Sequence, residues 1–574
     1  MPLAALFLAG VATRAPFVGT YLANWDSVQY ALGLTEFDVV RHQPHPPGSI
    51  LYVALGRLAL AITGEANLAL AWISVLAGAA SIVLCYVVGR ELFGARIALA
   101  GTVLFFASPL TWYYGAVALP YALEGALALA AVGLCWRAAE DRRLTAVVLA
   151  AAVLAVAGGV RQTTMLLLLP LWLYASWRAD LTPWPPSLKG KGERWGVGLA
   201  ESGPAPTPLG WRPANAHDES PRPPSSAGKG PGVRSLLVGG AVMAVLCLAW
   251  AVPLLVLSGG PALYVTASRQ LTSLVSSLTS VFVIGLPAIA ANVSYVWDVA
   301  TVGLNLALAT FAVYLLPGVR WPWRPSPAQR WFLWLWIGPP LLVFALMHIG
   351  QAGYLLLIWP LVCYAAATAS LTAADELARR FRARKQLSPT RQERRLSAAS
   401  VVIGALALSS MAIFLYSPLL GGVSGLAASR IRETDRFWRG VADIAQGLPP
   451  NQTVILTGTG ARESFRHATY YLPPFHVFAV GLDRDGALGV AFQGYEGEHT
   501  YAQFMAGDAA SRYHPLPAGT QRLLILDQSV AHLFPAGALQ TVEVTPHRDV
   551  WLWPAIPLGE ELHSLSFREP LIVE

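Results

Sequence analysis

Long apolar runs separated by short polar stretches dominate the pattern along the chain. A bilayer core needs roughly 20 apolar residues per helix, and on that measure we predict about eleven transmembrane helices. They lie near residues 2–20, 66–88, 94–110, 116–136, 144–160, 162–178, 235–257, 295–316, 330–348, 353–372 and 398–419. Arg14 and Pro16 interrupt the first run, which we interpret as an uncleaved or truncated first helix rather than a signal peptide.

Basic residues gather in every second loop. These loops carry Arg90 and Arg96, then Arg137, Arg142 and Arg143, then Arg178 with the lysines of a long insert, then Arg320, Arg324 and Arg330, and finally the basic run from Arg379 to Arg395. The positive-inside rule makes them cytoplasmic. The opposite loops, near 24–57, 108–118, 158–162, 259–294 and 348–353, are then external. This pattern predicts a multi-pass protein of the cytoplasmic (inner) membrane.

Two stretches depart from this alternation. Residues 181–234 are rich in Pro, Gly, Ser and Lys, which favours a disordered cytoplasmic insert. Beyond about residue 420 a helical stretch near Asp435 is followed by short strand-like runs: TVILT at 453, HVFAV at 476, RLLILD at 522, TVEVT at 541 and VWLW at 550. We therefore predict a transmembrane domain over 1–420 and a small external α/β domain over 421–574.

Composition agrees with this class of protein. Hydrophobic residues make up 55% of the chain and charged residues 13%, which is typical of a multi-spanning membrane protein. The net charge of +7 resides in loops that set topology, so we expect membrane lipids and no nucleic acid as partners. The four cysteines all lie in apolar segments, which favours packing over disulfides or metal binding.

The first predicted external loop, residues 24–57, concentrates ionisable groups close to the membrane. It contains Asp26, Glu36, Asp38, Arg41, His42, His45 and Arg57. Such groups are costly beside a bilayer unless they face water, substrate or each other. Further polar residues recur on the external side, at the ends of later spans or in the loops between them, namely Glu124, Arg161, Arg269, His348, Gln351 and Tyr354. We expect these groups to converge on an active site at the outer membrane surface.

The depth of these residues helps to choose between functions. A secondary transporter usually binds its substrate near the midplane, between repeated halves, and this chain shows neither feature. Transfer from a lipid-linked phosphate donor suits the residue set better. Asp26 is the candidate general base, with Glu124 as its partner or as a metal ligand. Arg161 and Arg269 are candidate contacts for the leaving phosphate, and a divalent metal could share that task.

Each candidate also has a structural interpretation. Asp26 could cap a helix that starts at Ser27, and Glu124 could form a buried ion pair. Arg161 and Arg269 could be interfacial side chains that extend towards the lipid headgroups.

The remaining candidates concern the shape of the site. His42 and His45 lie in RHQPHPPG, where the prolines favour a rigid turn at the substrate entrance over a metal site. His348, Gln351 and Tyr354 are candidate substrate contacts. The sequence TGTGARES at 457–464 resembles an anion-binding loop, but we interpret it as a structural turn.

Several segments resemble a known family. NWDSVQYAL followed by HQPHPPGSILYVALGRL resembles the first external loop of glycosyltransferases with the GT-C fold, close to the protein O-mannosyltransferase and aminoarabinose transferase group of glycosyltransferase family 39. ALPYALEGALAL, GGVRQTTMLLLLPLW and HIGQAGYLLLIWPL are similar to later external turns of its bacterial members. The resemblance covers roughly residues 1–420.

The resemblance implies an inverting enzyme that takes a sugar from a polyprenyl-phosphate carrier and transfers it to a protein, lipid or glycan. The acid of the family's first loop, its expected base, corresponds to Asp26, and a second external acid corresponds less closely to Glu124. Eukaryotic members carry paired acids in the first loop, whereas Ser27 follows Asp26 here. Two alternatives are a lipid or glycan transporter and a non-catalytic envelope protein with an external binding domain.

Overall fold

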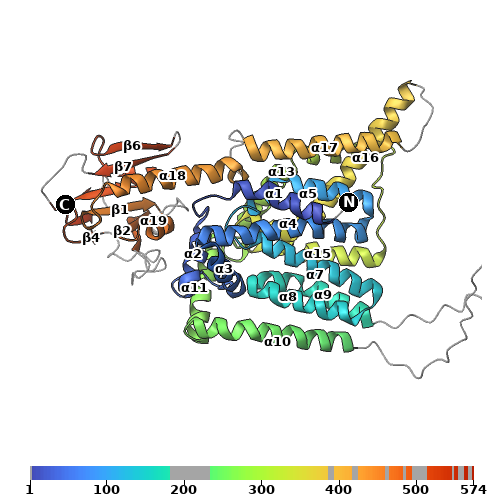
Figure 1. The fold of residues 1–574 in the computed structure, drawn as a ribbon, viewed down its shortest axis with the longest axis horizontal. Coiled ribbons are helices and arrows are strands. Elements are labelled where there is room, and N and C mark those ends of the chain that lie inside the picture. Colours follow the sequence, from blue (N-terminus) through green and yellow to red (C-terminus); the bar gives the residue numbers. More distant parts are fainter. Residues whose placement is uncertain are drawn as a thin grey trace, which may run out of the picture.

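The computed structural model describes residues 3–180, 233–385, 393–416, 424–458, 465–482, 486–493, 513–545, 548–553, 561–566 and 572–573. The predicted insert at 181–234 lies almost entirely outside these residues, as does most of the 457–464 turn. The described chain forms a large helical part and a smaller part built on a β-sheet. The two parts follow one another along the long axis of the molecule (Figure 1).

The helical part contains most of the chain up to residue 416. Its α-helices are α1 (Leu3–Arg14), α2 (Trp25–Thr35), α3 (Ile50–Thr63), α4 (Ala66–Phe93), α5 (Ala95–Ala107), α6 (Pro109–Tyr114), α7 (Tyr121–Asp141), α8 (Leu144–Val160), α9 (Gln162–Asp180), α10 (Arg234–Leu257), α11 (Pro261–Thr279), α12 (Val281–Ile284), α13 (Leu286–Leu304), α14 (Leu306–Ala309), α15 (Pro327–Leu346), α16 (Trp359–Lys385) and α17 (Glu393–Tyr416). Short 3-10 turns at Ala15–Phe17, Thr310–Leu315 and Ala352–Leu357 join some of them.

Each predicted apolar segment falls on a helix, but the predicted count of about eleven spans is not confirmed. Four helices of the described chain are long and apolar enough to cross a membrane: α4, α7, α10 and the Ala398–Tyr416 part of α17. A fifth is reached if the bent pair Leu286–Leu304 and Leu306–Leu315 counts as one span. Other apolar helices are shorter because polar or turn-forming residues end them, as Arg14 ends α1 and Ser108 ends α5.

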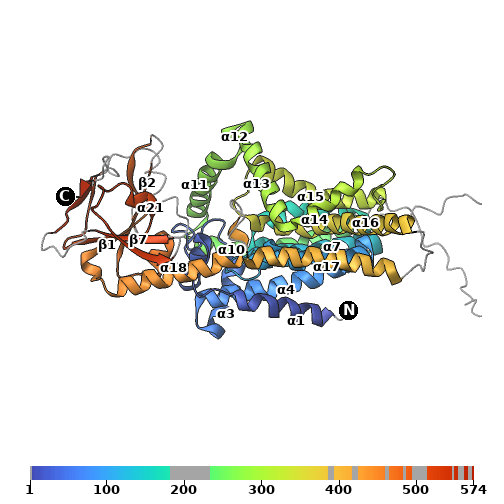
Figure 2. The same cartoon turned by 90° about the horizontal axis from the view of Figure 1, so that it is seen from above.

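The two predicted sets of loops lie at opposite ends of the helical part. Arg96 pairs with Asp375 at 2.9 Å, and Arg137 pairs with Glu91 at 2.5 Å, so the basic loops meet at one end. The rings of Phe93 and Trp323 lie 4.9 Å apart at the same end. The opposite end carries α2, α3 and α11 and faces the sheet (Figures 1 and 2).

The part beyond residue 424 combines two helices with the main sheet. The helices are α18 (Ala428–Gln446) and α19 (Phe465–Tyr471), with a short α21 (Gln528–Ala531). The strands are β1 (Thr453–Gly458), β2 (His476–Leu482), β3 (Leu488–Gln493), β5 (Arg522–Ile525), β6 (Gln540–Thr545) and β7 (Arg548–Trp553), in the order β3-β2-β1-β5-β7-β6. A second sheet has the order β4-β8-β9, with β4 (Tyr513–Pro515), β8 (Ser564–Ser566) and β9 (Ile572–Val573). All five predicted strand-like runs fall on strands of the main sheet.

Strand β1 lies inside the main sheet. All six residues of β1 are buried, and β1 pairs in parallel with both β2 and β5. Parallel strands of this kind are covered on both faces. One face packs under α18 and α19 through Phe437, Trp438 and Phe465. We call residues 424–573 the sheet region.

Candidate functional site

Helix α2 begins at the predicted catalytic loop. Asn24 is extended and its side-chain oxygen accepts a hydrogen bond from the backbone N–H of Asp26 at 2.9 Å, which satisfies one of the free donors of the first turn. Asn24 is therefore the helix cap, and the interpretation of Asp26 as a cap is wrong. The carboxylate of Asp26, in the first turn, is left for other contacts.

The Asp26 carboxylate is held by a residue from a distant turn. Gln351 donates from Nε2 to Oδ2 of Asp26 at 2.6 Å and contacts Oδ1 of Asn24 at 3.3 Å. The Asp26 side chain is 25% exposed, so solvent or a substrate can still reach it. The structure thus joins the first predicted external loop to the turn at 348–354.

His45 lies beside the same carboxylate. Its Nδ1 is 3.9 Å from Oδ1 of Asp26 and 2.5 Å from Oε1 of Gln29, which stands one turn further along α2. Burial lowers the pKa of His45, the negative charge of Asp26 opposes this, and Arg161 and Arg466 lower the pKa further. Three charged groups from different parts of the chain therefore act on one imidazole.

His42 occupies the tip of the same loop. Its φ of 60° is left-handed, and an isolated bridge between Asp38 and Gln43 closes the turn around it. Burial lowers the pKa of His42 to about 3, with further lowering from Arg466 and His45. An uncharged His42 in a closed turn agrees with the predicted architectural role.

Glu124 and Arg161 form a buried ion pair. Nη1 of Arg161 lies 3.2 Å from Oε2 of Glu124, and the side chains are 15% and 6% exposed. Thr164 donates its hydroxyl to the other carboxylate oxygen. The Glu124 carboxylate thus faces Arg161 and Thr164 rather than Asp26, as the structural interpretation predicts.

Aromatic rings hold the Arg161 guanidinium from the other side. Its carbon lies 3.7 Å from the ring centre of Tyr354 and 5.1 Å from that of Tyr121, which is the geometry of cation–π contacts. The ring of His348 lies 5.8 Å from Tyr354, and its Nδ1 is 3.0 Å from the Thr279 hydroxyl. The turn at 348–354 therefore contacts both Asp26 and Arg161.

Arg269, a predicted phosphate contact, forms no hydrogen bond or ion pair with the other candidate residues of the described chain. It stands on an exposed position of α11. The contact from α11 towards the loop comes instead from Tyr264, which lies 3.0 Å from Nε2 of Gln162 and 3.3 Å from the carbonyl oxygen of Pro47. The structure thus brings Asp26, His45, Gln351, Tyr354, Arg161 and Glu124 into one continuous cluster, which we call the acid–arginine cluster.

Sequence analysis missed several members of this neighbourhood. Gln29 follows Asp26 by three residues, so helical spacing alone could have placed it on the same face. Thr164 and Tyr121 lie near predicted candidates, but an uncharged side chain in an apolar run gives little signal. Arg466 belongs to the sheet region, which the sequence predicts as a separate domain.

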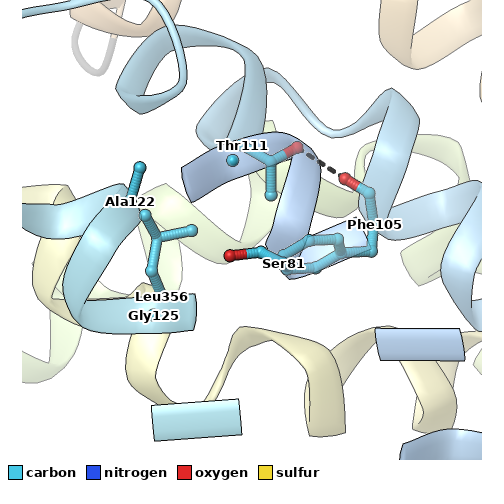
Figure 3. A pocket seen from close by; sticks show the side chains of 7 residues that line it. Ser81, Phe105, Thr111, Ala122, Gly125 and Leu356 are labelled. Atoms are coloured by element: carbon cyan, nitrogen blue, oxygen red, sulfur yellow. Dashed lines mark hydrogen bonds between the residues drawn. The ribbon is translucent and has the colours of Figure 1, made fainter. Parts of the chain in front are cut away.

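A small pocket lies elsewhere in the helical part. Figure 3 shows its lining, formed by Gly78, Ser81, Phe105, Thr111, Ala122, Gly125 and Leu356, with the Thr111 hydroxyl donating to the carbonyl oxygen of Phe105 at 2.5 Å. None of these residues is ionisable. The pocket therefore lacks the groups that acid–base or phosphate chemistry requires, and we assign it to packing.

The profile of one known protein family matches part of the chain. Residues 44–185 match the profile of the family described as dolichyl-phosphate-mannose-protein mannosyltransferase. Over this segment the chain is similar to that glycosyltransferase family. The match confirms the predicted kinship with the protein O-mannosyltransferases. The matched glycosyltransferase segment includes His45, Glu124 and Arg161, while Asp26 precedes it and the 348–354 turn follows it.

Solved structures of two glycosyltransferases align with the chain. ArnT from Cupriavidus metallidurans, bound to undecaprenyl phosphate, has 14% identity, with 96% of each chain covered and a TM-score of 0.48. The apo oligosaccharyltransferase of Archaeoglobus fulgidus has 12% identity, with 93% of this chain and 69% of that chain covered and a TM-score of 0.47. Both TM-scores are too low to transfer individual residues. No curated protein matches the chain by sequence.

Proposed function

We propose that the protein transfers a sugar from a polyprenyl-phosphate donor to an acceptor hydroxyl or amine, with inversion at the anomeric carbon. The observation that carries this is the exposed edge of the Asp26 carboxylate, fixed by Gln351 beside the Arg161 site. A general base must be held in place yet open to its substrate, and this carboxylate meets both conditions. The description of the matched family supports a sugar carried on a polyprenyl phosphate.

The proposed reaction is a single displacement. Asp26 accepts the proton of the acceptor, whose oxygen or nitrogen attacks the anomeric carbon from the face opposite the phosphate. The bond from that carbon to the phosphate oxygen breaks, and polyprenyl phosphate leaves with the electron pair. One displacement inverts the configuration.

Arg161 stabilises the leaving phosphate in this proposal. A guanidinium has five N–H donors, and the ion pair with Glu124 uses only one nitrogen. The remaining donors can form charge-assisted hydrogen bonds with phosphate oxygens as negative charge develops there. Glu124 then acts as a positioning residue that holds the guanidinium, and His348 and Tyr354 line the same space.

The reaction takes place on the external face of the inner membrane in this proposal. Helix α2, which carries Asp26, lies at the end of the helical part that faces the sheet region, away from the basic loops (Figure 1). The positive-inside rule then puts the site and the sheet region outside. The acceptor is a protein, a lipid or a glycan of the envelope.

A divalent metal between carboxylate and phosphate is the other element of the predicted chemistry. Among the residues that the structure describes, no group of three or more His, Cys, Asp or Glu side chains could hold a metal ion. We therefore assign no ligand set, and every step above is assigned to side chains of the chain.

The test is sugar transfer by the full-length protein in lipid nanodiscs, with polyprenyl-phosphate mannose as the first donor and other polyprenyl-phosphate sugars in turn. Donor cleavage and product formation are followed by mass spectrometry. We expect Asp26→Asn to abolish transfer while thermal unfolding stays unchanged, and Asp298→Asn, at an exposed acid of α13, to keep full activity. Full activity in Asp26→Asn would remove Asp26 as the base. Movement of intact donor across proteoliposomes without cleavage would instead favour a transporter.

A further inference from the structure

The sheet region contacts the helix that carries Asp26. Helix α19 packs against α2, with the rings of Phe465 and Trp25 6.0 Å apart. The guanidinium carbon of Arg466 lies 5.3 Å from the ring centre of Trp25, the residue directly before Asp26. Arg466 is only 7% exposed. A cation of the sheet region is therefore buried against the helix that carries the proposed base.

Hydrogen bonds hold the segment before α2 against helices α18 and α19. The Tyr471 hydroxyl accepts from the backbone N–H of Leu22 at 2.8 Å, and Nε2 of His467 donates to the carbonyl oxygen of Leu22 at 2.7 Å. The carboxylate of Asp435 on α18 accepts from the backbone N–H groups of Thr20 and Tyr21 at 2.8–2.9 Å. Residues 20–22, which lead into α2, are thus held by the sheet region. The position of Arg466 relative to Asp26 follows from this junction.

The charge of Arg466 also acts on the histidines of the loop that follows α2. It lowers the pKa values of both His42 and His45, and Arg161 acts on His45 as well. Two arginines therefore act electrostatically on the same imidazole, one from the helical part and one from the sheet region.

We propose that α19 completes the active site, with Arg466 as a second cation that binds the phosphate of the polyprenyl donor. This rests on the proposed function. The buried pair with Glu124 offsets the charge of Arg161, so a second guanidinium would add positive charge for the phosphate. Arginine is suited to the task because its planar N–H groups match phosphate oxygens in pairs. The sheet region is then part of the catalytic centre rather than a separate binding module.

The experiment measures binding of undecaprenyl phosphate to the full-length protein in nanodiscs, without any sugar transfer. Undecaprenol, which has the same chain and no phosphate, is the neutral probe. The variants are Arg466→Gln, Arg466→Lys and, as a matched control, Arg436→Gln at an exposed position of α18. Thermal unfolding of each variant checks that the fold is kept.

We expect Arg466→Gln to weaken binding of undecaprenyl phosphate by about 10- to 100-fold, the range of one lost charge-assisted hydrogen-bond pair. Arg466→Lys should lose less, because it keeps the charge, and Arg436→Gln should bind as the wild type does. Undecaprenol should bind all four proteins equally. Unchanged binding of undecaprenyl phosphate by a folded Arg466→Gln, or an equal loss for undecaprenol, would overturn the inference. Failure of the wild type itself to bind undecaprenyl phosphate would overturn the proposed function instead.

Discussion

Gln351 donates a hydrogen bond of 2.6 Å to the carboxylate of Asp26, although 325 positions separate the two residues. The contact joins the first turn of α2 to the segment between α15 and α16. A donor on one carboxylate oxygen fixes the orientation of the group and leaves the other oxygen, Oδ1, beside His45. Gln351 therefore fixes the orientation of the Asp26 carboxylate, the proposed base.

Replacement of Gln351 should impair catalysis more than binding. Hydrogen bonds to charged groups contribute about 1.5–3 kcal/mol, so Gln351→Ala should lower kcat by about 10- to 100-fold. KM for the donor should change little, because the phosphate contacts remain. Steady-state kinetics measure both constants. Gln270→Ala, at an exposed position of α11, is the control and should behave as the wild type. A change in KM alone would contradict a role through Asp26.

Loss of Glu124 should destabilise the protein. Glu124→Gln leaves the buried Arg161 without its negative partner, and removal of one member of a buried pair typically costs about 3–5 kcal/mol. Thermal unfolding in detergent should show a Tm lowered by several degrees. The double variant Glu124→Gln with Arg161→Gln should recover part of the loss, because no unpaired charge remains.

The exposed pair of Arg137 and Glu91 provides the control for this effect. The Arg137 side chain is 48% exposed, and pairs of this kind contribute about 0–1 kcal/mol. Glu91→Gln should therefore shift Tm much less than Glu124→Gln. Equal shifts would show that burial of the Glu124 pair has no special importance.

Local pattern predicted many of the helices and strands, but not α2, α3 and α11, which lie wholly or largely within predicted external loops. Hydropathy located α4, α7 and α10, and short strand-like runs located β1 and β7, because these features depend on neighbouring residues. The number of spans was not predictable in the same way. Helix α1 is cut short at Arg14, whose guanidinium is buried against Phe106 and Trp112 by contacts with residues far along the chain.

The candidate site could be predicted only in part. Charged residues in an apolar chain are conspicuous, so Asp26, Glu124 and Arg161 could be selected without a structure. Their pairing could not, since Glu124 faces Arg161 rather than Asp26 and only the packing of α7 against α8 and α9 decides this. Arg466 gave no sequence signal, because its role depends on the docking of α19 against α2.

Acid should destabilise the protein through two histidines outside the predicted spans. Burial lowers the pKa values of His42 and His467 to about 3 from the ordinary value of 6.5. Between about pH 6.5 and pH 3 the unfolded chain therefore binds protons that the folded chain does not, and stability falls as the pH falls through this window. Tm measured at pH 7, 6 and 5 should decrease progressively. The variant His42→Asn with His467→Gln should show a shallower decrease, since Asn tolerates the left-handed backbone at position 42. An unchanged slope would contradict the assignment.

Asp435 should control how firmly the segment before α2 is held. Its carboxylate accepts hydrogen bonds from the N–H groups of Thr20 and Tyr21. Asp435→Asn removes the charge and one acceptor oxygen, so at least one of these bonds is weakened or lost. Hydrogen–deuterium exchange of peptides covering residues 18–24 should become about 10-fold faster, as expected for a bond worth about 1.5 kcal/mol.

Asp443→Asn, at an exposed position of the same helix, should leave exchange unchanged. If the segment exchanges equally in both variants, Asp435 does not hold it. If exchange rises only in Asp435→Asn and kcat falls with it, then the sheet region positions the catalytic loop through this carboxylate.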